Sequence, residues 1–127
     1  GADIRANLPS DLRATGMILK AANRLLVPTG LRVAIPPGFE VQLRPRSGLA
    51  LKHGITLLNA PGTVDSDYRG EIGVILHNSG PQEFLIAHGD RIAQLVVAPV
   101  IQARFVNVDE LAGSERNAGG FGSTGRS

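Results

Sequence analysis

The amino-acid sequence predicts an all-β fold in a single domain. Short runs rich in Val, Ile and Leu recur along the chain and are separated by Gly, Pro, Asn and Asp, a rhythm typical of sandwiches and barrels. The length of 127 residues suits one domain, and a hydrophobic share of 43% is enough to form a core. Helical patterns are scarce, so we expect strands and turns to dominate.

Five runs are the expected strands, and side-chain alternation is clearest in the second of them. There Phe39, Val41 and Leu43 share one face, and polar residues occupy the other. The turns between runs have a known mechanism, because Pro presets φ and Gly accepts positive φ. In chain order the runs are RLLVPTGLRVAI (24–35), FEVQLRPR (39–46), EIGVILHNSG (71–80), RIAQLVVAPV (91–100) and QARFVNV (102–108).

The best helical candidate is a single turn in RSGLALKHG, where Ser47 can cap the amides that follow it. From Gly113 the composition changes to GSERNAGGFGSTGRS, which holds one aromatic residue and little else that can pack. Such a composition is typical of a flexible arm. We therefore divide the chain into a β domain over residues 1–112 and an arm over residues 113–127.

Composition excludes several functional classes. Cysteine is absent, which excludes disulfides, thiolate metal sites and cysteine nucleophiles. No apolar run is as long as a membrane span, no signal-peptide pattern is present, and the net charge of +2 comes with no block of basic residues. We expect a cytoplasmic protein that binds neither membrane nor nucleic acid. Because the chain opens at Gly1 without Met, we also expect residues upstream of it.

Two stretches near expected strand ends carry charged side chains. In PRSGL, Arg46, Ser47 and Gly48 can bind an anion through guanidinium, hydroxyl and backbone N–H together. An ordinary strand exit with a solvated arginine also fits this pattern. In GADIRA at the start of the chain, Asp3 lies among small and apolar residues, where a metal-facing carboxylate and a buried structural salt bridge both fit.

The stretch NAPGTVDSDYRGEIGV (59–74) crowds two aspartates and the only tyrosine between glycines. Asp65 can act as a general base if it is held within reach of a water molecule, and Tyr68 can lie flat against a planar ligand. An Asx-turn at the tip of a β-hairpin, with a half-buried tyrosine, is the structural alternative. For Asp67 we expect a structural role in keeping the hairpin closed.

Two further stretches are ambiguous on their own. In GDRIAQL a turn precedes a strand, and the amide of Gln94 needs a hydrogen-bond partner if it is buried. In RNAGGFGSTG, glycines and hydroxyls suit a phosphate, although a disordered linker has the same composition. Phe121 is unexpected there, because a flexible linker seldom needs a lone phenylalanine. The three histidines are scattered without the spacing of a zinc site.

The order of these stretches resembles the five-motif series of the trimeric dUTPases (deoxyuridine triphosphate nucleotidohydrolases). GADIRA, PRSGL, N-x5-D-x-D-Y-x-G, GDRIAQ and R-x3-GGFGSTG follow one another over nearly the whole chain. The resemblance implies a jelly-roll-like subunit of the β-clip type in a homotrimer, with active sites at subunit interfaces and an arm that closes over them. The implied reaction hydrolyses dUTP to dUMP and pyrophosphate with Mg²⁺ on the triphosphate, which supplies dUMP and keeps uracil out of DNA.

The resemblance also implies roles for individual residues. Asp65 matches the carboxylate that activates the water attacking the α-phosphorus. Tyr68 matches the ring that packs under deoxyribose and disfavours a 2′-OH, and Asp3 matches an aspartate that acts through the water shell of the metal. The positions that match contacts to uracil or deoxyribose are Asn59, Gly62, Val64, Tyr68 and Phe121.

The last motif departs from the family pattern. Asn117 and Ala118 stand where a glycine and a variable residue are usual, and because Asn tolerates left-handed backbone angles we expect the turn to survive. The departure removes no proposed catalytic group. The positions that match phosphate contacts are Arg46, Ser47, Gly48, Gln94, Arg116, Gly122, Ser123 and Thr124.

Two alternative functions share this fold. A dCTP deaminase, or a bifunctional deaminase–diphosphatase, resembles the same family but uses a glutamate shortly after the hairpin. Ile75 occupies that place here, and no arginine-rich signature follows PRSGL. The alternative from another class is a non-catalytic regulator that binds nucleotides or proteins. Loss of the aspartate or of the arm would favour it, and the sequence retains both.

Overall fold

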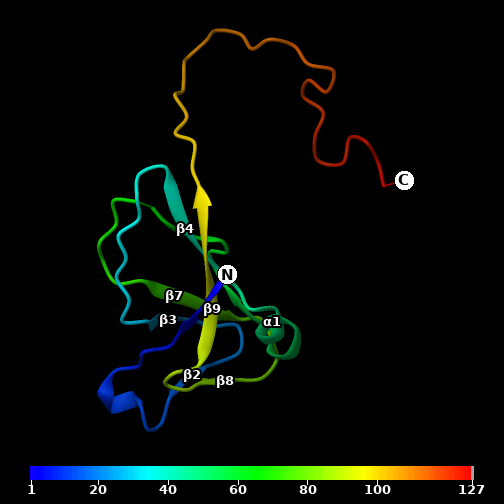
Figure 1. Ribbon diagram of the computed structural model, residues 1–127. Coiled ribbons are helices and arrows are strands. Elements are labelled where there is room, and N and C mark those ends of the chain that lie inside the picture. The colour runs from blue at the N-terminus through cyan, green and yellow to red at the C-terminus, as the bar shows by residue number, and fades with distance from the viewer. Residues whose placement is uncertain (127) are drawn as a thin grey trace.

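The computed structural model describes residues 1–126, and β-strands dominate it (Figure 1), as the sequence predicts. None of the helices in this described part is long and apolar enough to cross a membrane. The elements in chain order are β1 (Ala2–Arg5), the 3-10 helix η1 (Ser10–Leu12), β2 (Met17–Leu19), β3 (Arg24–Pro28), β4 (Phe39–Arg44), α1 (Ser47–His53), β5 (Ile55–Leu57), β6 (Gly62–Val64), β7 (Gly73–Asn78), β8 (Phe84–Ile86) and β9 (Arg91–Pro99).

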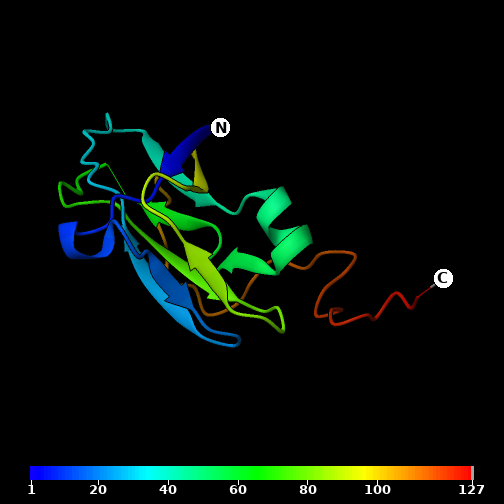
Figure 2. The same cartoon turned by 90° about the horizontal axis from the view of Figure 1, so that it is seen from below.

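The strands form antiparallel sheets, and β9 is the centre of the largest one. That sheet has the order β1-β9-β4-β6, while β3, β7 and β5 form a three-stranded sheet and β2 pairs with β8. The chain runs from β4 through α1 before it returns to the sheets, and Figure 2 shows this green helix at the edge of the domain. The two larger sheets therefore place residues from distant parts of the sequence side by side.

The core lies between the sheets and follows the period-two alternation of the strands. In β7 the residues Val74, Leu76 and Asn78 are buried and their neighbours are only half-buried. Asn78 is polar, but its Nδ2 donates to the carbonyls of Leu19 and Gln82 at 3.0 and 2.7 Å, so its burial leaves no donor unpaired. The core thus combines aliphatic packing with a fully bonded amide.

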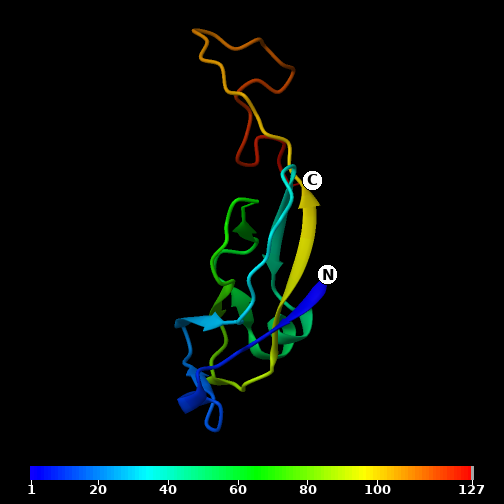
Figure 3. The same ribbon diagram turned by 60° about the vertical axis from the view of Figure 1, so that its left-hand side comes forward.

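Two of the expected strands are wrong in extent. The run 24–35 is a strand only over β3: residues 29–35 have no regular secondary structure, and Gly30 has a left-handed φ of 70° that ends the extended backbone. The run 102–108 contains no strand among the described residues: β9 ends at Pro99, and Phe105 is 93% exposed. Figure 3 shows this part leaving the domain beyond β9, away from any strand of this chain that could pair with it. A strand needs such a partner, and apolar alternation alone does not supply one.

The expected helical turn forms, but Ser47 is not its cap. Ser47 is the first residue of α1, and the N-cap position belongs to Arg46, whose side chain makes no capping hydrogen bond. The seven-residue helix ends at Gly54, which adopts a left-handed φ of 67° and returns its N–H to the carbonyl of Ala50 at 3.0 Å. The helix is therefore defined by its C-terminal cap and fixes Arg46 at its entry.

Candidate active site

The stretch 59–74 does not form the expected β-hairpin, because its two strands belong to different sheets. β6 pairs with β4, whereas β7 pairs with β3 and β5. The segment between them, with a turn at 66–67, crosses from one sheet to the other. Asp67 lies in this turn and accepts no hydrogen bond from the described residues, so the structure gives no support to its expected role in closing a hairpin.

This crossing encloses a cavity of about 180 Å³. Gly62 lies on its floor: a Cβ there would approach Leu43 Cβ to 3.2 Å and the amide nitrogen of Asn59 to 3.4 Å. Glycine at this position therefore keeps the cavity open next to Asn59. The cavity brings together the expected residues Asn59, Gly62, Val64, Asp65 and Tyr68, and its other lining residues are Leu43, Thr63, Glu71, Ile72 and Gly73.

Asp65 follows the last residue of β6 and is exposed to solvent. It lines this cavity and also a second hollow of about 430 Å³, which Asp67 and Phe39 line as well. A carboxylate at the border of two open spaces can contact both a ligand in the first and water in the second. That is the placement that a general base for water requires.

Tyr68 is held at the other side of the cavity. Its hydroxyl donates to the backbone carbonyl of Glu71 at 2.8 Å, and the ring is 45% exposed. The ring lies directly over Gly70, where an added Cβ would come within 2.3 Å of the tyrosine oxygen. The aromatic side chain is thus fixed at its tip while one part of its surface stays open to the cavity.

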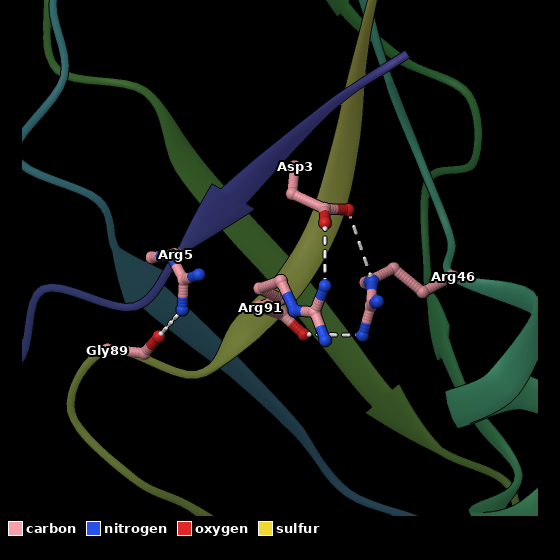
Figure 4. Close-up of polar contacts among 5 residues, drawn as sticks. All are labelled: Asp3, Arg5, Arg46, Gly89 and Arg91. Carbon is pink, nitrogen blue, oxygen red and sulfur yellow. Dashed lines mark hydrogen bonds and ion pairs between the residues drawn. The ribbon is translucent and has the colours of Figure 1, made fainter.

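A second cluster forms where β1, β9 and the entry to α1 meet, and Figure 4 shows its centre at Asp3. Asp3 Oδ1 lies 3.3 Å from Nε of Arg46, and Asp3 Oδ2 accepts a hydrogen bond of 3.3 Å from Nη1 of Arg91. Nη1 of Arg46 donates to the carbonyl of Arg91 at 3.3 Å. Gln94 stands opposite Asp3 in the β1–β9 register. Three distant parts of the sequence therefore meet here, with more positive than negative charge.

The arginines control the ionisation of Asp3. Burial raises the pKa of Asp3, but the positive charge of Arg46 lowers it. A hydrogen bond with Gln94 and the nearby guanidinium of Arg91 lower this pKa further, so that it lies below its ordinary value of 3.8. The side chain is an ionised carboxylate at neutral pH. The structure thus shows a salt bridge at Asp3, although an exposed one and not the buried one expected, and the metal-facing role stays a prediction.

Ser47 and Gly48, beside Arg46 in the sequence, are both exposed at the start of α1. A Cβ added to Gly48 would meet nothing within 4 Å, and its φ is not positive. Nothing in this chain's own packing requires glycine there. An exposed glycine without a packing reason fits close approach of an external group to the backbone.

The arm lies apart from both clusters, as Figures 1 and 3 show. Its backbone hydrogen bonds are local, such as those from Gly119 N to Arg116 O and from Ser123 N to Gly120 O. Asn117 has a φ of 45°, so the turn expected at the departure from the family pattern is present. The last residue of the expected arm, 127, lies outside the described residues. The expected site residues Arg116, Phe121, Gly122, Ser123 and Thr124 are exposed and contact neither cluster.

Two residues near these clusters were missed by sequence reasoning. The sequence predicts Arg91 only as the first residue of the strand 91–100, yet its guanidinium also contacts Asp3. The sequence predicts no site role for Glu71, yet it lines the cavity and its backbone carbonyl accepts a hydrogen bond from the Tyr68 hydroxyl. Arg91 could have been found from the sequence, because it lies three residues before Gln94 in the same expected strand. In the structure both residues stand opposite residues of β1. No sequence pattern near Glu71 indicates its role, because its carboxylate binds the N–H of Gly30, which is distant in the sequence.

The same chain is similar to known proteins over almost all its length. The family model for dUTPase matches residues 11–125. The deoxyuridine 5'-triphosphate nucleotidohydrolase of Dinoroseobacter shibae is 61% identical over 126 residues, which cover 99% of this chain and 81% of that relative.

Solved structures agree with this similarity. The dUTPase of Staphylococcus bacteriophage 80alpha, solved with dUPNHPP, has a TM-score of 0.80 at 26% identity, with 98% of this chain and 85% of that chain covered. A mutant dUTPase from phage phi11 of S. aureus, described with a structural Mg(II) ion, shares the fold with a TM-score of 0.70 at 22% identity, over 87% of this chain and 84% of that chain. On the family model and the 61% identical relative, the chain belongs to the dUTPase family.

Proposed function

We propose that the chain hydrolyses dUTP to dUMP and pyrophosphate, which supplies dUMP and keeps uracil out of DNA. The activity is that of the 61% identical relative, named deoxyuridine 5'-triphosphate nucleotidohydrolase. The observation that carries the proposal is the cavity that joins Asn59, Gly62, Val64, Asp65 and Tyr68. These residues combine a polar backbone segment, an aromatic ring and an accessible carboxylate, which a nucleoside and an attacking water require.

In the proposed complex the cavity holds the deoxyuridine. Backbone groups and the amide of Asn59 bind the uracil edge, and cytosine is rejected because its mismatched donors and acceptors leave buried groups unpaired. Tyr68 packs against the deoxyribose and excludes a 2′-OH. The open floor at Gly62 accommodates the base, since any side chain there would fill the space beside Asn59.

Asp65 is the proposed general base. Its carboxylate takes a proton from a water molecule while the water oxygen forms a bond to the α-phosphorus. The bond from the α-phosphorus to the oxygen that bridges to the β-phosphorus breaks, and pyrophosphate leaves with the electron pair. Positioning and neutralisation of charge carry most of the catalysis in such transfers, so the remaining residues act as binding groups.

Arg46, Gln94, Ser47 and Gly48 are the proposed phosphate contacts. Arg46 lines a cavity of about 240 Å³ that shares no residue with the nucleoside cavity of the same chain. This separation supports a site that different subunits complete. Exposed apolar side chains such as Val97 and Ile101, at 61% and 94%, further support burial against other subunits. We infer a homotrimer with active sites at its subunit interfaces.

Magnesium fits this site only as a partner of the substrate. Among residues 1–126, no group of three or more His, Asp or Glu side chains comes together to hold an ion, and Asp3 is already paired with two arginines. Mg²⁺ commonly keeps its waters and binds through one or two carboxylates plus substrate phosphates. Asp3 would hold it through a water molecule, and the ion would neutralise charge on the triphosphate.

The arm is the proposed lid. Phe121 is fully exposed in the part of the chain that the structure describes. We infer that it covers the uracil once dUTP is bound, while Arg116, Gly122, Ser123 and Thr124 contact the phosphates. Closure of a glycine-rich segment would exclude bulk water and complete the binding site.

One assay tests the proposed function. Pyrophosphate release is measured with dUTP, dCTP, dTTP and UTP, each with and without Mg²⁺. We expect turnover of dUTP that depends on Mg²⁺ and far slower turnover of the other three. Faster reaction of dCTP, with release of ammonia, would instead support a deaminase, and absence of turnover with tight dUTP binding would support a regulator. Equal turnover of dUTP and UTP would contradict the role of Tyr68.

A further inference from the structure

The segment that follows Tyr68 is hydrogen-bonded to residues 29–31 through both backbone and side chain. The backbone N–H of Gly30 donates to the carboxylate of Glu71 at 2.8 Å, and Ile72 N–H donates to the carbonyl of Leu31 at 2.8 Å. The buried hydroxyl of Thr29 donates to the carbonyl of Ile72 at 2.5 Å and accepts from Leu31 N–H at 3.2 Å. Residues 71–72 are thus anchored at several points.

The segment 29–31 is itself held in place. Gly30 has a φ of 70°, and an added Cβ would come within 2.4 Å of the side-chain nitrogen of Asn7. The neighbouring Pro28 accepts a backbone hydrogen bond of 2.8 Å from Asn7. The N–H that reaches Glu71 is therefore presented from a fixed backbone and not from a mobile loop tip.

Glu71 transmits this anchoring to Tyr68. Its carboxylate accepts from Gly30, while its backbone carbonyl accepts the hydroxyl of Tyr68 at 2.8 Å. Gly70 leaves the ring just enough room, since a Cβ there would lie 2.5 Å from Cζ of the ring. A continuous series of hydrogen bonds therefore connects Gly30 through Glu71 to the hydroxyl of Tyr68. Without the carboxylate contact, the carbonyl that fixes the ring is held only by the hydrogen bonds of Ile72 to Leu31 and Thr29.

We propose that Glu71 is a positioning residue that sets the place of the Tyr68 ring and thereby the preference for deoxyribose over ribose. The inference rests on the proposed function only for its specificity part. A planar ring excludes a 2′-OH only if it cannot retreat, so the hydrogen bond at its tip decides how strict the exclusion is. Glu71 lines the cavity but acts through Tyr68 and not on the substrate.

The test uses the full chain with three substitutions at this position. Glu71→Ala removes the acceptor, Glu71→Asp draws the carboxylate back by one methylene, and Glu71→Gln keeps an oxygen at the same reach. Glu83→Ala is the matched control, because Glu83 is exposed and lies outside the nucleoside cavity. Tyr68 is the only tyrosine and no tryptophan is present, so intrinsic emission reports on this side chain alone.

We expect acrylamide to quench the Tyr68 emission of Glu71→Ala and Glu71→Asp more strongly than that of the wild type. The ratio of kcat/KM for dUTP to kcat/KM for UTP should fall about two- to tenfold in these variants, the loss that one hydrogen bond predicts. Glu71→Gln and Glu83→Ala should match the wild type in both measurements. If Glu71→Ala does not fold, Glu71→Asp decides the question.

Unchanged quenching in the variants that lose the contact would overturn the positioning role. Increased quenching with an unchanged dUTP-to-UTP ratio would overturn the role in specificity. Equal effects in Glu71→Ala and Glu71→Gln would also contradict the inference, because the oxygen acceptor is the proposed cause. Quenching needs no turnover, so a wild-type chain that failed to hydrolyse dUTP would refute the proposed function while this measurement still tested the placement of Tyr68.

Discussion

Asp65 and Asp3 are both expected site residues, but they differ in their ion pairing. Asp65 is exposed at the border of two hollows and makes no ion pair among the described residues, whereas Asp3 is clamped between Arg46 and Arg91. A carboxylate clamped by two guanidiniums is a poor proton acceptor, while one beside open water is free to accept a proton. The geometry thus favours Asp65 as the base and leaves Asp3 to organise charge.

Asp65→Asn removes the proton acceptor and keeps the size of the side chain. We expect the rate of dUTP hydrolysis to fall by roughly 10²–10⁴-fold, the usual contribution of a general base. Binding should persist, because the cavity walls are unchanged, and a non-hydrolysable dUTP analogue should still perturb Tyr68 emission. An undiminished rate of pyrophosphate release would show that another group activates the water.

The lowered pKa of Asp3 predicts a pH dependence of stability. A carboxylate whose pKa is depressed in the folded state stabilises the fold above its ordinary value of 3.8, and this contribution disappears as the pH falls through the lower folded value. In Asp3→Asn that contribution is absent, so its thermal midpoint should fall less steeply than that of the wild type below pH 3.8. Parallel melting curves from about pH 6 to about pH 2.5 would contradict this origin of acid sensitivity.

Strand prediction succeeded where both partners of a strand lie within this chain. The runs of β4, β7 and β9 alternate or are continuously apolar, and each pairs with strands on both sides. The run 102–108 also contains apolar residues but pairs with no strand among residues 1–126, so its apolar side chains are exposed. The error at 59–74 has a related cause: turn chemistry specifies a reversal of the chain, but it cannot specify that the strands on either side join different sheets.

Gly48 within α1 and Gly54, which caps the end of α1, separate the requirements of stability from those of function. Gly54 has a φ of 67°, and a Cβ there would come within 2.7 Å of the backbone nitrogen of Gly80, so Gly54→Ala should lower the free energy of unfolding by about 1–3 kcal/mol. At Gly48 the space is open and φ is not positive, so Gly48→Ala should be neutral or stabilise by up to about 1 kcal/mol.

For enzymatic activity we expect the opposite: Gly48→Ala should be the more damaging of the two substitutions. Gly48→Ala places a methyl group where we propose a phosphate approaches the backbone, so its KM for dUTP should rise while Gly54→Ala, assayed well below its melting temperature, keeps its KM. Urea unfolding and steady-state kinetics on the same preparations measure both quantities. A Gly48→Ala variant with wild-type KM would remove Gly48 from the phosphate contacts.

The sequence predicted which residues form the nucleoside part of the site, but not how the parts of the site are arranged in space. Motif order identified Asn59, Asp65 and Tyr68, and the structure places them around one cavity. Spacing along the sequence could not show that Arg46 lines a separate cavity, because that depends on how β1, β9 and α1 meet. The arm residues have no local feature that fixes their position. Phe121 in this arm is fully exposed among the described residues, so the fold of the chain gives no reason for an aromatic side chain there.

Removal of residues 113–127 tests whether the arm is a functional element and not part of the folded domain. Among the described residues of the arm, all backbone hydrogen bonds are internal to it, so we expect the thermal midpoint to change little. Activity should fall by about 100-fold or more, because the closed and water-excluded state cannot form. Phe121→Ala should show an intermediate loss, and a truncated chain with full activity would exclude a lid.

Subunit mixing tests whether the two separated clusters belong to one site. Asp65→Asn removes the proposed base beside the nucleoside cavity. Arg46→Ala removes a proposed phosphate contact in the cluster around Asp3. Each variant alone should therefore be nearly inactive. If Asp65 of one subunit acts with Arg46 of another, random mixing of equal amounts through mild unfolding and refolding produces intact sites. About one quarter of the sites would then carry both native residues, since each is contributed by an independently chosen subunit. Recovery near that fraction, in a particle whose mass in light scattering equals three chains, would support the shared site. If each chain carried its own complete site, mixing would recover nothing, because every chain lacks one of the two side chains.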